Sequence, residues 1–209
     1  MMDFVGFPKI ARLSREMIIT EKIDGTSGCV CIVEQDGYEA EGAVYQSDGL
    51  AMYVGSRKRW ITPKTDNHGF AAWAHEHGDE LLALGPGRHF GEWWGQGIQR
   101  GYGLKEKRFS LFNVTRWCLH DNEPQRIVTG DPRQEKYQEK LPACCGLVPI
   151  LSRGSFSTLL ALAALEDLER HGSYAVPGFL QPEGIVVYHV AGNVCFKKTI
   201  VGDERKGAQ

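Results

Sequence analysis

The sequence predicts an α+β domain of antiparallel sheets with flanking helices. Short apolar or β-branched runs separated by glycine-containing turns cover most of the chain, whereas only two stretches show the spacing of an amphipathic helix. Many strands with only two helices between them favour antiparallel sheet over a repeating strand–helix–strand unit. At 209 residues, 42% hydrophobic and 24% charged, the chain is long enough for one domain with a substantial core.

The first part of the chain is expected to form strands and then one helix. Residues 17–23 and 29–33 are apolar runs on either side of a glycine-rich turn at residues 24–28, a pattern typical of antiparallel hairpins. A helix is expected next, ahead of a Gly-Pro-Gly stop at residues 85–87, because apolar and aromatic side chains recur at helical spacing. The residues on this predicted helix face are Phe70, Trp73, His77, Leu81 and Leu84.

The second half is expected to contain strands around a second helix. Residues 88–94 and 109–117 are predicted to be strands joined by a glycine-rich loop. The second helix is expected over residues 157–171, with Ser157 at its N-cap and Gly172 just past its end.

The last elements are predicted to be two strands that pair across a tight turn. They cover residues 184–189 and 194–200, with the turn at residues 191–193. No linker or repeat divides the chain, so we expect a single domain over residues 1–201 and a flexible tail over residues 202–209.

The charge balance excludes a strongly basic or acidic protein. The chain has 24 Lys and Arg against 26 Asp and Glu, a net charge of −2, so any contact with nucleic acid must come from a local patch. No apolar run approaches the roughly 20 residues of a spanning helix, and the first residues lack the features of a secretory leader. We therefore expect a cytoplasmic protein with no membrane association.

The cysteines and histidines predict no structural zinc. The six cysteines form no Cys-x-x-Cys pair, and nothing spaces four nitrogen or sulfur ligands. His75 and His77 stand two positions apart in the expected helix, which would point their rings in different directions. Free thiols in a reducing compartment are the expectation.

The P-loop, GxGxxG and GxSxG patterns are all missing from the sequence. The remaining candidates for catalysis are polar residues within or beside apolar strands, and Lys22 is the first of them. Lys22 ends an apolar strand and is followed by Asp24 in a glycine-rich turn, which favours a held nucleophile. A nucleophilic lysine needs cationic neighbours or desolvation, because an ordinary amine is protonated at neutral pH. The alternative is an edge-strand lysine beside a turn.

Two further polar sets suit the binding of a nucleotide or nucleic acid. Arg57, Lys58 and Arg59 precede an aromatic residue and would either grip phosphate or form a solvated surface. Glu92 lies among aromatic residues and glycines, where it could accept hydrogen bonds from a hydroxyl pair such as a ribose or could pair with an arginine.

A carboxylate and a lysine near the C-terminus complete the candidate site. Glu183 opens an apolar strand, and Lys197 follows about fourteen residues later. If their strands are neighbours, Glu183 could hold Mg²⁺ or its waters while the lysine binds phosphate. Lys197 and Lys198 must point to opposite faces of a strand, so only one of them can serve, and we expect it to be Lys197.

Four segments, in chain order, resemble the motifs of the covalent nucleotidyltransferases, the superfamily of ATP-dependent RNA and DNA ligases and mRNA capping enzymes. They are Lys22-Ile-Asp24-Gly, Phe90-Gly-Glu92, Glu183-Gly-Ile-Val-Val and Phe196-Lys197. Additional segments are most similar to the RNA ligase branch, namely Glu21-Lys22-Ile-Asp-Gly-Thr, Gly55-Ser-Arg57 and Phe109-Ser-Leu-Phe112. The resemblance spans nearly the whole chain and implies a nucleotidyltransferase domain.

The resemblance implies roles in nucleotide binding for five residues. Lys22, with Asp24 in the same motif, would attack the α-phosphorus of ATP and hold AMP covalently. Glu21 would help to recognise the adenine edge, and Glu92 would bind the ribose hydroxyls. Phe109 would stack on the base.

It also implies roles at the phosphates, the metal and the nucleic acid. Arg57 would contact the AMP phosphate or the nucleic-acid end, and Lys58 and Arg59 would extend this basic patch. Glu183 would organise Mg²⁺ or Mn²⁺, and Lys197 would bind the α-phosphate and act in catalysis.

The implied function is ATP-dependent RNA ligation, which joins a 3′-hydroxyl to a 5′-phosphate through an adenylylated 5′ end. The nucleic-acid partner would be RNA, an RNA/DNA hybrid or DNA ends. An ATP-dependent DNA ligase, a GTP-dependent capping enzyme and a non-catalytic nucleotide- or RNA-binding module remain alternatives. The chain ends soon after Lys197, so we expect a minimal form without a C-terminal OB-fold. We also expect a monomer.

Overall fold

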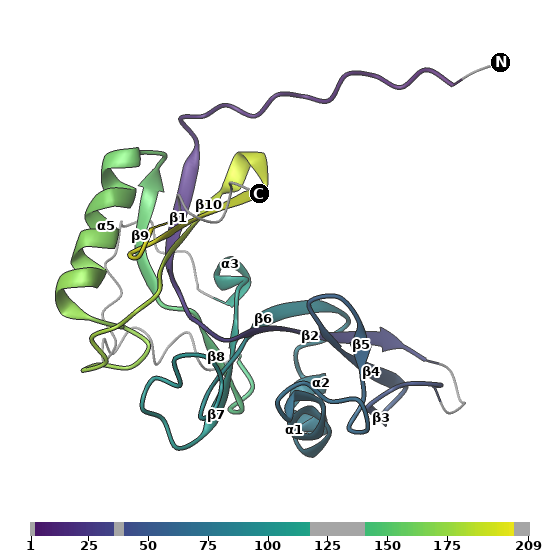
Figure 1. Ribbon diagram of the computed structural model, residues 1–209. Helices are drawn as coiled ribbons and strands as arrows, with labels where there is room; N and C mark the ends of the chain where they lie inside the picture. Colours follow the sequence, from purple (N-terminus) through teal and green to yellow (C-terminus); the bar gives the residue numbers. More distant parts are fainter. Residues whose placement is uncertain (1–2, 36–39, 118–140, 203–209) are drawn as a thin grey trace.

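The computed structural model describes residues 3–35, 40–117 and 141–202 and arranges them in two β-sheets with a few helices (Figure 1). Sheet A has the strand order β11-β10-β1-β9, and sheet B has the order β3-β4-β2-β6-β7-β8 with β5 paired to β4. The α+β prediction is therefore confirmed in outline. None of the helices in these described ranges is long and apolar enough to cross a membrane.

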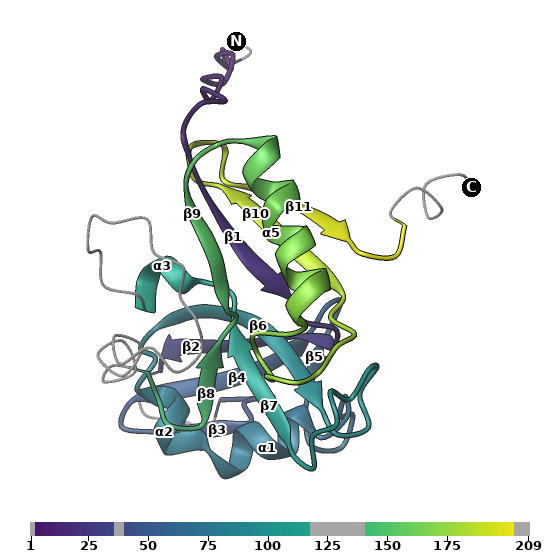
Figure 2. The same ribbon diagram turned by 90° about the vertical axis from the view of Figure 1, so that its left-hand side faces the viewer.

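Sheet A is antiparallel, and a long helix covers one of its faces (Figure 2). Its strands are β1 (Glu16–Lys22), β9 (Ile150–Ser155), β10 (Gly184–His189) and β11 (Val194–Thr199). Helix α5 (Thr158–His171) packs on it through a cluster that includes Leu165, Leu168 and Ile185. As the sequence predicts, the Ser157 hydroxyl caps the helix by accepting the Leu160 N–H, and Gly172 ends it.

Sheet B is larger and carries the short helices. Its strands are β2 (Thr26–Glu34), β3 (Tyr45–Ser47), β4 (Leu50–Ser56), β5 (Trp60–Ile61), β6 (Gly87–Gly95), β7 (Lys107–Leu111) and β8 (Cys145–Leu147). Helices α1 (Phe70–Glu76) and α2 (Gly78–Leu82) pack on it through aromatic and aliphatic side chains such as Phe70, Trp93 and Leu81. The pair β7–β8 is parallel, so the prediction of purely antiparallel sheets is wrong at this edge.

A third apolar cluster joins the two sheets. It combines Ile18 of β1 and Ile150 of β9 with Trp94 of β6 and Tyr102 of the loop after β6. Burial of these side chains is the favourable term that holds the sheets together. The chain passes from sheet A to sheet B directly through residues 23–25, which connect β1 to β2.

Three predicted elements differ from the structure. Strands β1 and β2 belong to different sheets and do not form the expected hairpin. The expected helix over residues 70–84 is broken at His77, where Gly78 packs so closely on Tyr45 that an added Cβ would lie 2.2 Å from the ring. The expected strand over residues 109–117 ends at Leu111 and is followed by helix α3 (Val114–Trp117).

The C-terminal strands agree with the sequence prediction. Strands β10 and β11 pair in antiparallel fashion, and the short helix η1 (Val190–Gly192) and Asn193 make the turn between them. Asn193 has a φ of 48°, a left-handed conformation that asparagine tolerates well. Of the predicted tail, residues 203–209 lie outside the described residues.

Candidate active site

Lys22 lies where the two sheets meet. It is the last residue of β1, and its Cα is in register with Gly184, the first residue of β10. Gly25 follows in the connection to β2, where an added Cβ would lie 2.5 Å from the carbonyl oxygen of Trp93. Only glycine allows this close approach, which holds the Lys22 segment against the adjacent strand β6.

Glu183 pairs directly with Lys22. Lys22 Nζ lies 2.6 Å from Glu183 Oε2, and the two side chains are only 24% and 18% exposed. Gly184, next to Glu183, has a φ of 155°, and an added Cβ would lie 2.2 Å from the Lys198 carbonyl oxygen. The Glu-Gly sequence therefore has a steric reason: glycine lets β10 and β11 approach closely beside the carboxylate. The sequence predicted cationic neighbours for Lys22, whereas its ion-pair partner here is a carboxylate.

Glu92 brings a second carboxylate to Lys22. Its Cα is in register with Ser27 of β2 and Ser110 of β7, so it sits on a central strand of sheet B. Burial raises the pKa of Glu92 to about 7, and the positive charge of Lys22 and the Gly25 N–H oppose that rise. The negative charges of Glu183 and Asp24 also raise this pKa, which shows that all four groups share one electrostatic environment.

Arg100 ties Asp24 to the segment that precedes Glu183. Arg100 Nε lies 2.8 Å from Asp24 Oδ2, and Arg100 Nη1 donates to the Gln181 carbonyl oxygen at 2.9 Å. The Asp24 N–H donates to the Tyr102 hydroxyl at 2.9 Å. Sequence reasoning missed Arg100, because a lone arginine in a glycine-rich loop does not reveal which distant segment it will contact.

Lys197 lies on the face of sheet A that also carries Lys22. Strand β10 places Val186 between Thr20 of β1 and Lys197 of β11, and Thr20 shares a face with Lys22. Lys198 is in register with Ile185, which is buried against α5 on the opposite face. The strand register thus confirms the predicted orientation of the two lysines; the catalytic role of Lys197 stays a prediction.

Glu21 lies on the other face of β1 and is buried. Its carboxylate accepts hydrogen bonds from the Ser173 hydroxyl at 2.6 Å and from the N–H groups of Tyr174 and Ala175 at 2.8 and 3.0 Å. Burial raises the pKa of Glu21, and these hydrogen bonds oppose the rise. Because the carboxylate already has three donors, the observed contacts hold residues 173–175; its predicted contact with the adenine edge stays a prediction.

Phe109 is placed in the core, and the structure contradicts its predicted stacking role. Its side chain is fully buried, with its ring centroid 4.9 Å from that of Phe70. Phe112 is 43% exposed, and its N–H donates to the Phe90 carbonyl oxygen, which extends the β6–β7 ladder by one residue. By strand alternation Phe112 lies on the same face as Ser110, the residue paired with Glu92, and Phe90 lies on that face two residues before Glu92, so Phe90 and Phe112 both place exposed aromatic rings there.

The basic residues 57–59 form an exposed turn after β4. The Ser56 N–H donates to the Arg59 carbonyl oxygen, and Arg59 Nη1 donates to the Thr65 carbonyl oxygen at 2.9 Å. Arg59 is therefore held by its own chain. Within the ranges that the structure describes, no hydrogen bond or ion pair connects this turn to Lys22 or its carboxylates, and the predicted binding roles of Arg57, Lys58 and Arg59 remain predictions.

The fold and these contacts define an α+β protein with a lysine–carboxylate site at the junction of two sheets. A family model described as RNA ligase matches residues 15–201. The chain therefore belongs to the RNA ligase family. No curated protein sequence matches this chain significantly.

Solved structures of the Naegleria gruberi RNA ligase have a similar fold. A point mutant with ATP and Mn is 19% identical with a TM-score of 0.55, over 90% of this chain and 50% of that chain. A second mutant with AMP and Mn is 21% identical with a TM-score of 0.52 over the same shares. The ligase with PPi is 20% identical with a TM-score of 0.52, over 89% of this chain and 50% of that chain. The present chain thus spans about half the length of these ligases.

Proposed function

We propose that this chain carries out ATP-dependent RNA ligation, in which a 3′-hydroxyl is joined to a 5′-phosphate through a lysyl-AMP intermediate. The observation that carries the proposal is the Lys22–Glu183 contact of 2.6 Å at the sheet junction, with Glu92 and Asp24 in the same electrostatic environment. Family membership supports RNA as the substrate. The Naegleria structures with ATP or AMP and Mn support these as the ligands here.

The donor set suits a hard divalent cation. Glu183 offers carboxylate oxygens, which Mg²⁺ and Mn²⁺ prefer, and the carboxyl groups of Glu92 and Asp24 lie in the same electrostatic environment. Such a cation would supply charge neutralisation for the phosphates. Because Glu183 Oε2 accepts from Lys22 Nζ, coordination by this carboxylate would compete with the ion pair and would release the amine. Glu183 therefore positions Lys22 until the nucleotide and its cation arrive.

The proposed reaction has three steps, each a displacement at phosphorus. Lys22 Nζ attacks the α-phosphorus of ATP, a P–N bond forms, the P–O bond to pyrophosphate breaks, and the amine proton passes to solvent. An oxygen of the RNA 5′-phosphate then displaces Lys22, which gives an adenylylated 5′ end. The 3′-hydroxyl finally attacks the 5′-phosphorus, AMP leaves, and a phosphodiester bond remains.

The surrounding residues would bind the parts of AMP. Glu92, whose pKa is about 7, is partly protonated near neutral pH and can both accept from and donate to ribose hydroxyls. Lys197 would bind the α-phosphate from the face of sheet A that it shares with Lys22. Phe112 takes the stacking role first predicted for Phe109, because its ring is exposed beside the strand pair that carries Glu92.

Contact with RNA would come from the exposed basic turn, since the net charge of the chain is −2. Arg57 and Lys58 have side chains available there, whereas Arg59 is held by the Thr65 carbonyl oxygen. Binding through a few such cations is weak and strongly salt-dependent. We propose that the catalytic domain covers residues 1–201, a range that includes the matched residues 15–201.

Covalent adenylylation tests the proposal. The protein is incubated with ATP and Mg²⁺ or Mn²⁺, and intact-mass analysis is expected to show a gain of one AMP that Lys22→Ala abolishes. Lys198→Ala is the matched control, because Lys198 points to the α5 face. A folded wild-type chain that never gains AMP would support the non-catalytic module. Gain of GMP from GTP, but no AMP from ATP, would support the capping enzyme.

Strand joining distinguishes the ligase alternatives. Nicked duplexes in which the nick is flanked by RNA, by DNA or by one of each are offered to the adenylylated protein. Sealing of RNA ends in preference to DNA ends is expected. Sealing restricted to DNA would contradict the RNA ligase proposal while leaving the lysyl-AMP step intact.

A further inference from the structure

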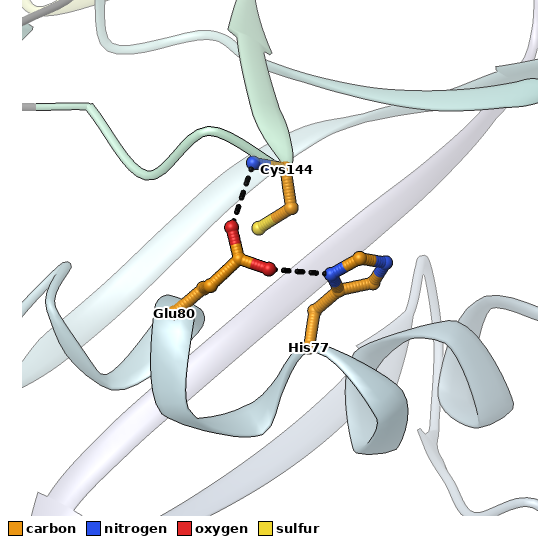
Figure 3. Close-up of side chains that lie close together, drawn as sticks. All are labelled: His77, Glu80 and Cys144. Carbon is orange, nitrogen blue, oxygen red and sulfur yellow. Dashed lines mark hydrogen bonds and ion pairs between the residues drawn. The ribbon is translucent and has the colours of Figure 1, made fainter.

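A second group of ligand-type side chains lies at the helices of sheet B. His77 occupies the break between α1 and α2, Glu80 lies in α2, and Cys144 immediately precedes β8 (Figure 3). His77 Nδ1 or Nε2, a carboxylate oxygen of Glu80 and Cys144 Sγ all lie within 4.8 Å of one another. The chain brings them together from segments that are 64 residues apart.

The observed hydrogen bonds orient the carboxylate at the centre of this cluster. His77 Nδ1 lies 2.8 Å from Glu80 Oε1, and the Cys144 N–H donates to Glu80 Oε2 at 3.2 Å (Figure 3). The Cys144 sulfur lies 3.9 Å from Cys145 Sγ, and its thiol also interacts with the Glu80 carboxylate. His77 and Glu80 side chains are 34% and 44% exposed, so an ion can reach them from solvent.

We propose that His77, Glu80 and Cys144 form a zinc site with three protein ligands and one water. Imidazole nitrogen, carboxylate oxygen and thiolate sulfur are the three donor types that Zn²⁺ uses in proteins. Tetrahedral coordination needs N–O separations of about 3.3 Å and separations to sulfur of about 3.6 Å. The observed donor atoms require movements of under about 1.5 Å to reach these separations, which side-chain torsions can supply.

The geometry also shows why the sequence alone predicted no zinc. That prediction counted nitrogen and sulfur ligands at fixed spacings, whereas this set uses a carboxylate and an open position for water. His77 contacts Glu80 three residues further along the chain, whereas the ring of His75 lies against Tyr45. The expected divergence of the two histidines thus agrees with only one of them joining the cluster.

A metal at this point would stabilise the protein by linking α2 to the beginning of β8. Both elements pack on the cluster of apolar residues that includes Leu81 and Leu141, and the Cys144 N–H donates a hydrogen bond to Glu80. In the described part of the chain, no hydrogen bond or ion pair connects His77, Glu80 or Cys144 with Lys22, Glu92 or Glu183. The site is therefore separate from the proposed ligase chemistry, and either proposal can fail without the other.

Metal binding to the reduced, metal-stripped protein tests the proposal. Titration with Zn²⁺ against a chromogenic chelator is expected to show one site that Cys144→Ser weakens by at least about 10-fold, with a similar loss for His77→Gln. Cys145→Ser and His75→Gln are the matched controls and should stay near wild type. Co²⁺ provides the second readout, because thiolate ligation produces a charge-transfer absorption that a carboxylate site cannot give.

The outcomes are distinct. Stoichiometric Zn²⁺, a Co²⁺–thiolate band lost in Cys144→Ser, and a rise in Tm with Zn²⁺ in wild type but not in that variant support the site. No thiolate band in folded wild type, or equal Zn²⁺ affinity in wild type and Cys144→Ser, overturns it. Loss of binding in Cys145→Ser equal to that in Cys144→Ser overturns the proposed ligand set.

Discussion

Glu92, which we propose binds the ribose hydroxyls of the nucleotide, is expected to lower the stability of the folded protein at neutral and higher pH. Its pKa rises from the usual 4.5 to about 7 in the folded chain, chiefly because of burial. A carboxyl group with a raised pKa binds its proton more tightly in the folded state. This tighter proton binding by Glu92 adds to the free energy of unfolding. The added stability is complete below pH 4.5, declines as the pH rises toward about 7, and is lost above that value.

The magnitude follows from the two pKa values. A rise from 4.5 to about 7 corresponds to about 3 kcal/mol between ionising Glu92 in the folded chain and in the unfolded chain. Glu92→Gln keeps the shape and can still accept the Gly25 N–H, but it has no charge to bury. The variant is therefore expected to be more stable than wild type by about 3 kcal/mol at about pH 8 and equal to it at about pH 4.

Urea unfolding of both proteins across this pH range measures the difference. Glu76→Gln, at an exposed position on α1, is the control and should show no such pH-dependent gap. The same Glu92→Gln protein should adenylylate more slowly, because the carboxylate is proposed to bind ribose. A wild-type protein that is the more stable of the two at about pH 8, or a gap that does not change with pH, would refute the reasoning.

The other predictions concern residues that hold the site in place and residues whose side chains point toward it. Arg100→Ala should slow adenylylation by about 10- to 100-fold, because Asp24 loses its partner and the segment before Glu183 loses its tether; single-turnover rates that match wild type would contradict this role. Lys197→Ala should impair AMP transfer far more than Lys198→Ala, and equal effects in the same mass assay would count against the facing argument. Phe112→Ala should raise the KM for ATP with little change in Tm, and an unchanged KM would remove the stacking proposal.

Local sequence patterns were sufficient where neighbours in the chain decide the structure. The N-cap at Ser157, the end of α5 at Gly172 and the β10–β11 turn all depend on backbone geometry within a few residues. The opposite facing of Lys197 and Lys198 follows from strand alternation alone, and the register with Val186 and Ile185 confirms it.

Predictions failed where a distant segment determines the outcome. At the break in the expected helix over residues 70–84, Gly78 packs on Tyr45, a contact that no spacing pattern can reveal. Phe109 and Phe112 are three residues apart and chemically alike, yet only the packing of Phe70 against sheet B shows that Phe109 is internal. The apparent hairpin of β1 and β2 fails because each strand pairs with later strands in its own sheet.

The sequence by itself was sufficient to predict the family. It also marked Lys22, Asp24, Glu92 and Glu183 as candidate site residues, because charged residues next to glycine and apolar strands form a pattern that can be read without the structure. Only the tertiary structure decided that Glu183 is the partner of Lys22, and that Arg100 binds Asp24. It also decided that His77, Glu80 and Cys144 meet. The physical reason is that the contacts Lys22–Glu183, Asp24–Arg100 and Glu80–Cys144 each join residues more than 60 positions apart. Strand pairing and core packing bring such residues together, and both are properties of the whole chain.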